Sequence, residues 1–377
     1  MPNLLSDRPR PSRLLTLGCG VLAVATIAAA CGGGGDDSSS STLVLETTSA
    51  PAVTTADVGD EIPSSTTSSS STTTEAPVPA TMPLSGTIVT DAALANRPAL
   101  AVKIDNVSSA RPQAGINQAD VVYEERVEGG LTRLLAVFHS QDSADLGPVR
   151  SARSTDVPLL TPLNQPLFAW SGANEAFANL IRSVAIQDVG LEAHPSVYER
   201  RAGRRSPSNL FTSTEALWGL VEVTADMAPH PAFSYRDAQS PTATGEAAAG
   251  VRVSYRGTTV THIWSDEVVG YSRTQNDSAH VDADGVQVAP DNVVVQFVDY
   301  KASGQVDSAG AQVPEAILEG SGEVWVLMNG IVVKGTWAKS NVTSPTIYLD
   351  GSGSEILLEP GSTWVLLAEP DRAELIG

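Results

Sequence analysis

The sequence predicts a mixed α/β or α+β first half built on a mixed sheet, followed by a mostly antiparallel, all-β second half. Hydrophobic residues make up 42% of the 377 residues, which is enough to bury the cores of two ordinary domains. Strand-like and helix-like runs alternate in residues 86–236, whereas strand and turn patterns fill residues 251–370. Charge also differs: residues 86–210 hold 12 Lys and Arg against 13 Asp and Glu, and residues 211–377 hold 8 against 22. We therefore predict two domains, joined by a linker over residues 237–250.

The first 30 residues have the pattern of a secretory signal. Arg8, Arg10 and Arg13 precede the apolar run LLTLGCGVLAVATIAAA, which is short for a membrane span. The run ends in AAAC, and this step resembles the lipobox of bacterial lipoproteins, in which small residues precede the cysteine that receives the lipid. On that interpretation Cys31 becomes the acylated N-terminus and holds the chain on the outer face of the cell membrane. An ordinary cleavage site and an uncleaved anchor helix are the alternatives.

Residues 31–85 separate this anchor from the body of the protein. They are rich in Ser, Thr, Pro and Gly, and they contain seven acidic residues and no Lys or Arg. Such a composition buries too little apolar surface to offset chain entropy, so we predict a disordered tether, with a glycosylated mucin-like stalk as the alternative. The other cysteine, Cys19, lies within the signal, so the exported chain is expected to have no internal disulfide.

The two halves differ in their predicted elements. In the first half the predicted elements are a strand in residues 97–106, a hairpin in 119–140 around Gly129-Gly130, a helix that begins near Ser154 or Thr155, a strand in 165–172 and a helix in 173–183. In the second half the predicted strands lie in residues 251–257, 261–275, 291–301, 322–340, 345–353 and 355–369. Asn329-Gly330 between two apolar runs is a strong hairpin signal.

Several of these runs resemble a known family. RPALAVKIDNVSSARPQAGINQADVVYEERVEGGLTRLLAVFHS and LGPVRSARSTDVPLL are similar to the N-terminal domain of the YerB-like lipoproteins, and NVVVQF, VLMNGIVVKGTWAKS and LEPGSTWVLL are similar to their C-terminal domain. The match spans most of residues 86–370 in the family's order. Both domains are of unknown function, so the resemblance implies a two-domain, membrane-anchored architecture and no catalytic residue. Ser208 and Trp170 stand where the family usually has histidines.

Arg150 and Arg153 form the candidate site. They lie just before the predicted start of a helix, where free backbone N–H groups and the positive end of the helix dipole attract anions. Two guanidinium forks at that place would bind phosphate, sulfate or carboxylate. Asp105 and Asn106 follow a predicted strand, and Arg111 comes soon after them. We expect these three residues to belong to the same site, because ligands bind at the carboxyl ends of strands in open α/β sheets.

Two other interpretations of these residues stay open. Asn106 has the chemistry of an ordinary turn residue. Each arginine has carboxylates available for internal pairing, and the candidates are Asp105, Asp120, Glu124, Glu125 and Glu128.

The same carboxylates also suggest an enzyme as a different class of function. Asp105 with Glu124, Glu125 and Glu128 would supply the paired acids that glycoside hydrolysis uses. On a strand, however, Glu124 and Glu125 point to opposite faces. That geometry favours solvent-facing or arginine-paired acids.

We predict neither a metal nor a cofactor. The five histidines lack zinc-binding spacing, VDADGVQ lacks most ligands of a calcium loop, and there is no nucleotide-binding loop or serine-hydrolase motif. The net charge of -20 and the export signal argue against nucleic acid. We expect a lipid-anchored extracytoplasmic binding or accessory protein whose partners are the membrane, through Cys31, an anionic cell-wall or other ligand, and envelope proteins. An envelope glycan- or peptide-processing enzyme and a scaffold without ligand are the alternatives.

Overall fold

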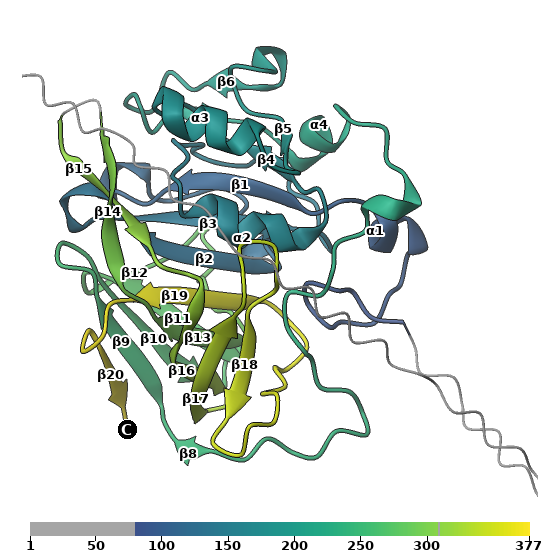
Figure 1. Cartoon of the computed structure of the whole chain (residues 1–377), viewed down its shortest axis with the longest axis vertical. Coiled ribbons are helices and arrows are strands. Elements are labelled where there is room, and N and C mark those ends of the chain that lie inside the picture. Colours follow the sequence, from purple (N-terminus) through teal and green to yellow (C-terminus); the bar gives the residue numbers. More distant parts are fainter. Residues whose placement is uncertain (1–79, 308–309) are drawn as a thin grey trace, which may run out of the picture. The chain divides into compact units, whose positions relative to one another are not determined.

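The structure, a computed structural model, describes residues 80–307 and 310–377 (Figure 1). The predicted signal, Cys31 and most of the predicted tether lie outside the described residues. The described residues belong to one compact unit. Within these ranges, no helix has both the length and the apolar character needed to cross a membrane.

Five strands of the first half pair in one sheet. They are β1 (Leu100–Asp105), β2 (Val121–Arg126), β3 (Thr132–Phe138), β4 (Leu167–Ala169) and β5 (Gln187–Asp188). β3 is antiparallel to both β1 and β2, whereas β4 is parallel to β1 and β5 is parallel to β4. β1, β2 and β4 therefore end at the same edge of the sheet.

Strands of the second half continue the same sheet. They are β13 (Asn292–Phe297), β16 (Gly320–Met328), β17 (Ile331–Lys339), β18 (Ile347–Asp350) and β19 (Thr363–Ala368), with the short β8 (Glu246–Ala247) against β17. β19 lies between β13 and β2 and is parallel to both. The order is therefore β18-β17-β16-β13-β19-β2-β3-β1-β4-β5, in a sheet of 11 strands that crosses from one half of the chain to the other.

The remaining strands form smaller sheets. An antiparallel sheet in the order β12-β11-β10-β9-β20 consists of β9 (Gly250–Ser254), β10 (Thr259–Ser265), β11 (Gly270–Gln275), β12 (Ser278–Ala279) and β20 (Ala373–Ile376). Two hairpins stand apart from it, and they are β6 (Glu199–Arg200) with β7 (Leu210–Phe211) and β14 (Tyr300–Val306) with β15 (Gln312–Ala316).

The helices are short. The α-helices are α1 (Ala92–Asn96), α2 (Asp156–Leu160), α3 (Glu175–Arg182) and α4 (Thr214–Trp218). Single 3-10 turns span Ser108–Ala110, Ile116–Gln118, Glu128–Gly130, Thr161–Leu163, Pro195–Val197 and Ala225–Met227. Most of the regular structure in residues 80–307 and 310–377 is therefore strand.

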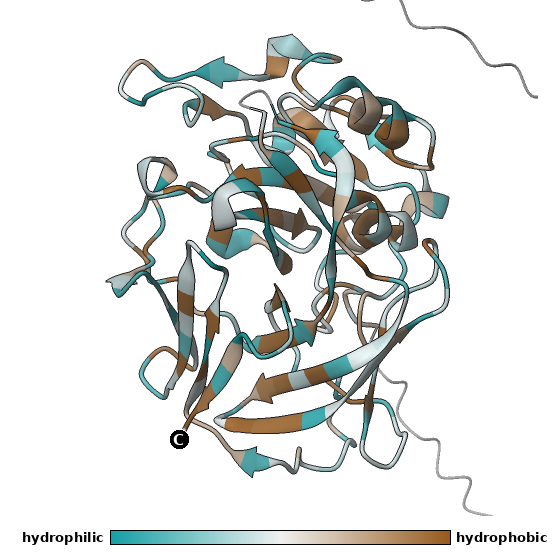
Figure 2. Ribbon diagram, turned by 60° about the vertical axis from the view of Figure 1, so that its left-hand side comes forward, coloured by the Kyte–Doolittle hydropathy of each residue, from teal (hydrophilic) through white to brown (hydrophobic). Residues whose placement is uncertain are grey.

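Both faces of the central strands of the large sheet, β1, β3, β13 and β19, are buried. One face packs against the sheet of β9–β12 and β20, and its apolar core includes Val102, Ile104, Val122, Val251 and Val253. The other face packs against α2 and α3, and its core includes Ala101, Leu135, Val157, Leu160 and Ile181. Figure 2 shows long apolar stretches along these strands. Burial on two faces explains why several strands are nearly continuous apolar runs in the sequence.

The predicted fold class is confirmed: a mixed sheet with helices in the first half and mostly antiparallel strands in the second. Asn329 and Gly330 join β16 to β17 with φ of 49° and 76°, the positive values that a two-residue hairpin turn requires. The packed part of the chain begins earlier than the predicted tether boundary at Ser85, because Met82 and Leu84 are buried.

Candidate functional site

A hollow of about 480 Å³ lies where β1 and β4 end and β3 begins. We call it the arginine pocket, and it is lined by Arg133, Arg150, Ser151, Arg153, Gly172, Ala173, Asn174, Phe177, Val306, Asp307 and Val313. Val306 and Val313 come from the β14–β15 region, so both halves of the chain contribute to the lining. The pocket lies at the carboxyl edge of parallel strands, where open α/β sheets usually bind ligands.

Arg150 is the most accessible of the three arginines, with 26% of its side chain exposed against 9% for Arg133 and 7% for Arg153. Its Nε donates to Asp105 Oδ2 at 3.2 Å, and Nη1 donates to Ser151 Oγ at 3.2 Å. The structure therefore brings Arg150 and Asp105 together as an ion pair. Part of the guanidinium stays open to the pocket.

Arg153 is held by a buried carboxylate. Its Nε and Nη2 donate to the two oxygens of Glu128 at 2.8 and 2.9 Å, and Nη1 donates to the carbonyl of Ala152 at 2.7 Å. Both predicted arginines thus have the internal partner that the sequence left open. Arg153 adds positive charge to the wall of the pocket, while most of its donors are already used.

Arg133 is the third arginine, and the sequence analysis missed it. It lies directly opposite Asp105 in the β1–β3 register, and its Nη1 donates to the carbonyl of Ser151 at 3.1 Å. Burial, followed by the charges of Arg153 and Arg150, lowers the pKa of Arg133 to about 10. Three guanidinium groups are thus crowded around one hollow. The sequence did carry a signal for Arg133. Side chains alternate between the two faces along a strand, so Arg133 and Leu135 of the predicted hairpin lie on the same face.

Helix α2 begins where the sequence predicts, with Thr155 as the N-cap residue and Asp156 in the first turn, but the Thr155 side chain makes no capping hydrogen bond. Asp156 Oδ2 accepts from the backbone N–H of Arg153 at 2.7 Å. The buried carboxylate of Asp156 therefore satisfies a backbone donor at the start of its own helix. Gly172, Ala173 and Asn174, which line the pocket, lead into the eight-residue α3. Asn174 Oδ1 caps α3 by accepting from Phe177 N at 2.9 Å. The partial positive charge of a helix N-terminus therefore faces the arginine pocket from α3.

Asn106 and Arg111 do not join this site. Asn106 Nδ2 donates to Thr132 Oγ1 at 2.8 Å and to Glu124 Oε1 at 3.3 Å, in a buried polar cluster on the opposite face of the sheet. Arg111 is half-buried, and burial, followed by the charge of the nearby Arg273, lowers its pKa. The five predicted residues are therefore divided between the two faces of the sheet.

Glu124 and Glu125 point to opposite faces, as predicted. Both oxygens of Glu124 accept from Arg273 Nη2, at 3.0 and 2.9 Å, whereas Glu125 accepts from Lys103 Nζ on the other side. Burial raises the pKa of Glu125, although the charge of Lys103 opposes that shift. With Arg150 on Asp105 and Arg153 on Glu128, all four acids of the enzyme alternative are buried and paired with a cation.

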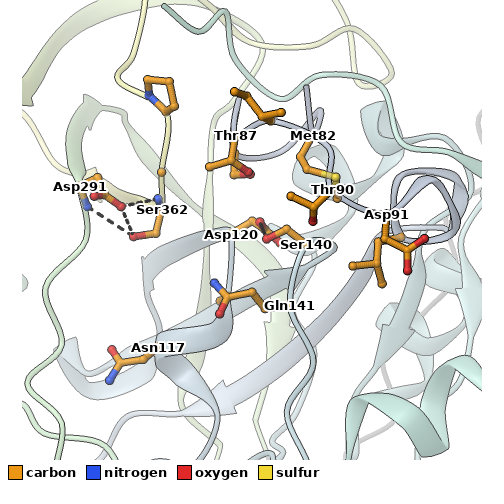
Figure 3. Close-up of a pocket in the computed structure, with 16 residues that line it drawn as sticks. Met82, Thr87, Thr90, Asp91, Asn117, Asp120, Ser140, Gln141, Asp291 and Ser362 are labelled. Carbon is orange, nitrogen blue, oxygen red and sulfur yellow. Dashed lines mark hydrogen bonds between the residues drawn. The ribbon is translucent and has the colours of Figure 1, made fainter. Parts of the chain in front are cut away.

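A second hollow, of about 610 Å³, lies at the opposite edge of the sheet, before β2, β13 and β19 (Figure 3). Asp120 Oδ2 accepts from the backbone N–H groups of His139 and Ser140 at 2.6 and 2.9 Å. Asp291 Oδ2 accepts from Ser362 N and Oγ at 2.7 and 3.0 Å. These acids fix the loops that border the hollow. Across residues 80–307 and 310–377, no three His, Cys, Asp or Glu side chains are grouped to hold a metal ion.

Comparison with known proteins finds two family domains in this chain. Residues 84–226 match the N-terminal domain, and residues 251–365 the C-terminal domain, of a protein of unknown function, DUF3048. The curated relative "Putative lipoprotein YerB" of Bacillus subtilis (strain 168) is 27% identical over 300 residues, which cover 78% of this chain and 88% of the relative. The crystal structure of YerB protein from Bacillus subtilis matches with a TM-score of 0.69 and 25% identity, over 79% of this chain and 100% of that chain. Because both domains are present in their order, this chain belongs to the DUF3048 family and is a homologue of YerB.

Proposed function

We propose that the protein is a lipid-anchored, extracytoplasmic binding protein that holds an anionic group in the arginine pocket. One observation carries the proposal: Arg133, Arg150 and Arg153 line a single hollow. Burial, followed by the charges of Arg153 and Arg150, lowers the pKa of Arg133. An anion between the three arginines would offset the repulsion between their charges and accept hydrogen bonds from the accessible fork of Arg150.

The chemistry of the ligand follows from the lining. Guanidinium forks and a helix N-terminus both favour phosphate, sulfate or carboxylate groups. The volume of about 480 Å³ is within the range of small-molecule sites, so the pocket has room for more than a lone ion. Phe177, Val306 and Val313 add apolar surface for the rest of such a molecule. A cell-wall fragment that carries an acidic group has this combination of features.

The burial and ion pairing of the carboxylates favour a binding role over a glycan- or peptide-processing reaction. A general acid or nucleophile must reach the substrate. Asp105, Glu124, Glu125 and Glu128 are buried and paired with Arg or Lys instead. The scaffold alternative predicts that no anion stabilises the protein.

The anion is tested by thermal unfolding in inorganic phosphate, with chloride at equal ionic strength as the reference. A ligand that binds the folded state alone stabilises it by about 2.7 kcal/mol at 100 times its Kd, so phosphate should raise the Tm. Arg150→Gln should lose that phosphate-dependent rise. The exposed Arg252, paired with Glu374, supplies the matched control, and Arg252→Gln should keep it. If phosphate and sulfate leave the Tm of the parent unchanged, the pocket does not bind these anions.

The membrane anchor is tested separately, at Cys31. Acylation of this cysteine should place the expressed protein in the membrane fraction and label it with a fatty-acid analogue. Cys31→Ser should abolish the label and release the chain, because a thioether-linked lipid needs the thiol. Retention of the label by Cys31→Ser would exclude Cys31 as the lipidation site.

A further inference from the structure

A second group of arginines lies on the hairpin of β6 and β7 and its connecting loop, which we call the basic hairpin (residues 199–211). Residues 200–205 read RRAGRR, in a chain whose net charge is -20. Arg200 and Arg205 are exposed, and Arg201 and Arg204 are half-buried. Figure 1 shows β6 at the top margin of the described chain. The basic hairpin is therefore a local concentration of positive charge on an acidic protein.

Contacts with the rest of the first half hold the basic hairpin in one conformation. Arg201 Nη1 and Nη2 donate to the two oxygens of Asp145 at 2.7 and 2.6 Å. Its guanidinium lies 4.0 Å from the ring centre of Phe211 in β7. Arg204 donates to the carbonyls of Ala110 and Pro112 at 2.8 and 2.5 Å. A surface that is already ordered loses little entropy when it binds a partner.

Much of this charge has no carboxylate partner. Asp145 and Glu199 both pair with Arg201. Arg200 donates to the neutral amide oxygen of Asn209 at 3.0 Å, and the partners of Arg204 are neutral carbonyls. Among the described residues, Arg200, Arg204 and Arg205 therefore form no ion pair. Burial, followed by the charge of Arg201, lowers the pKa of Arg204, so an external anion would relieve this repulsion as well.

We propose that the basic hairpin binds the phosphate headgroups of an anionic lipid surface. Planar guanidinium groups match phosphate geometry, and anionic membranes attract clusters of basic residues within a Debye length. Exposed arginines on a hairpin suit an extended array of phosphates better than a single enclosed anion. The inference rests on the proposed attachment to the membrane, which would keep the body close to the bilayer. The lipid and the basic hairpin would then provide two separate contacts with the membrane.

The test uses the chain from residue 31 with Cys31→Ser, which keeps every described residue and carries no lipid. It is co-sedimented with vesicles of phosphatidylglycerol and phosphatidylcholine in equal parts, and with vesicles of phosphatidylcholine alone. We expect binding to the anionic vesicles that weakens with added salt. Arg200→Gln/Arg205→Gln should weaken it about twenty-fivefold, because one basic residue near an anionic surface contributes roughly fivefold. The control Arg252→Gln/Arg256→Gln removes two exposed arginines of the second half and should change binding little.

Three outcomes would overturn the inference. Equal binding to both kinds of vesicle would exclude headgroup charge as the cause. An equal loss of vesicle binding in the control Arg252→Gln/Arg256→Gln would show that the net charge of the protein determines binding and that the basic hairpin has no special role. Binding to soluble polyphosphate without binding to the anionic vesicles would assign the basic hairpin to a polymer. The vesicle assay needs neither acylation nor the arginine pocket, so its failure and the failure of the proposed function are distinguishable.

Discussion

At the scale of single residues, the Glu124–Arg273 ion pair links the large sheet to the sheet of β9–β12 and β20. Both side chains are fully buried, and Glu124 also accepts from Trp364 Nε1 at 3.1 Å. Removing one partner of a buried pair strands the other charge, which typically costs 3–5 kcal/mol. Arg273→Met should therefore lower the free energy of unfolding in urea by about that amount.

Two further variants separate this pair from the general effect of losing an arginine. Glu124→Gln/Arg273→Met removes both charges and should recover part of the stability. Arg252→Met breaks the exposed pair with Glu374 and should cost about 1 kcal/mol or less. If Arg273→Met costs no more than Arg252→Met, the buried pair contributes nothing beyond a surface contact.

Residue chemistry in the sequence was enough to select Arg150, Arg153 and Asp105, but it did not reveal their partners. The pairing depends on strand register, which sets Asp105 opposite Arg133 and gives Arg133 to the pocket. The division of Asp105 from the neighbouring Asn106 has the same origin, because side chains one residue apart near the end of a strand diverge to opposite faces. Arg111 lies beyond the end of β1, after the 3-10 turn Ser108–Ala110, so strand alternation does not set its position.

At the scale of elements, the apolar periodicity of the sequence was sufficient for β1 to β4, α2, α3 and most strands of the second half. The β6–β7 hairpin was missed, because two-residue strands in RRAGRRSPSN carry no apolar alternation. The role of α3 at the arginine pocket was also missed. The sequence shows where α3 begins, but its position beside Arg150 depends on β4 lying parallel to β1.

At the scale of the whole molecule, the position of β19 joins the two family domains. Nothing local in the run that forms β19 specifies its neighbours, since parallel pairing between distant segments is set by the tertiary fold. The structure places β19 between β13 and β2, with six residue pairs on one side and four on the other. The last long strand of the second half therefore covers the edge of β2 that the first half alone would leave unpaired.

This arrangement predicts how the protein responds to a cut in the predicted linker over residues 237–250. Residues 237–239 and 244–247 are exposed, so brief proteolysis should cleave in this segment. The two fragments should nevertheless elute together from a size-exclusion column in native buffer, because the β19–β2 ladder and the apolar core on both faces still join them. They should separate only in denaturant, when the sheet unfolds. Fragments that separate in native buffer would mean that each family domain folds alone and that the shared sheet contributes little to holding the halves together.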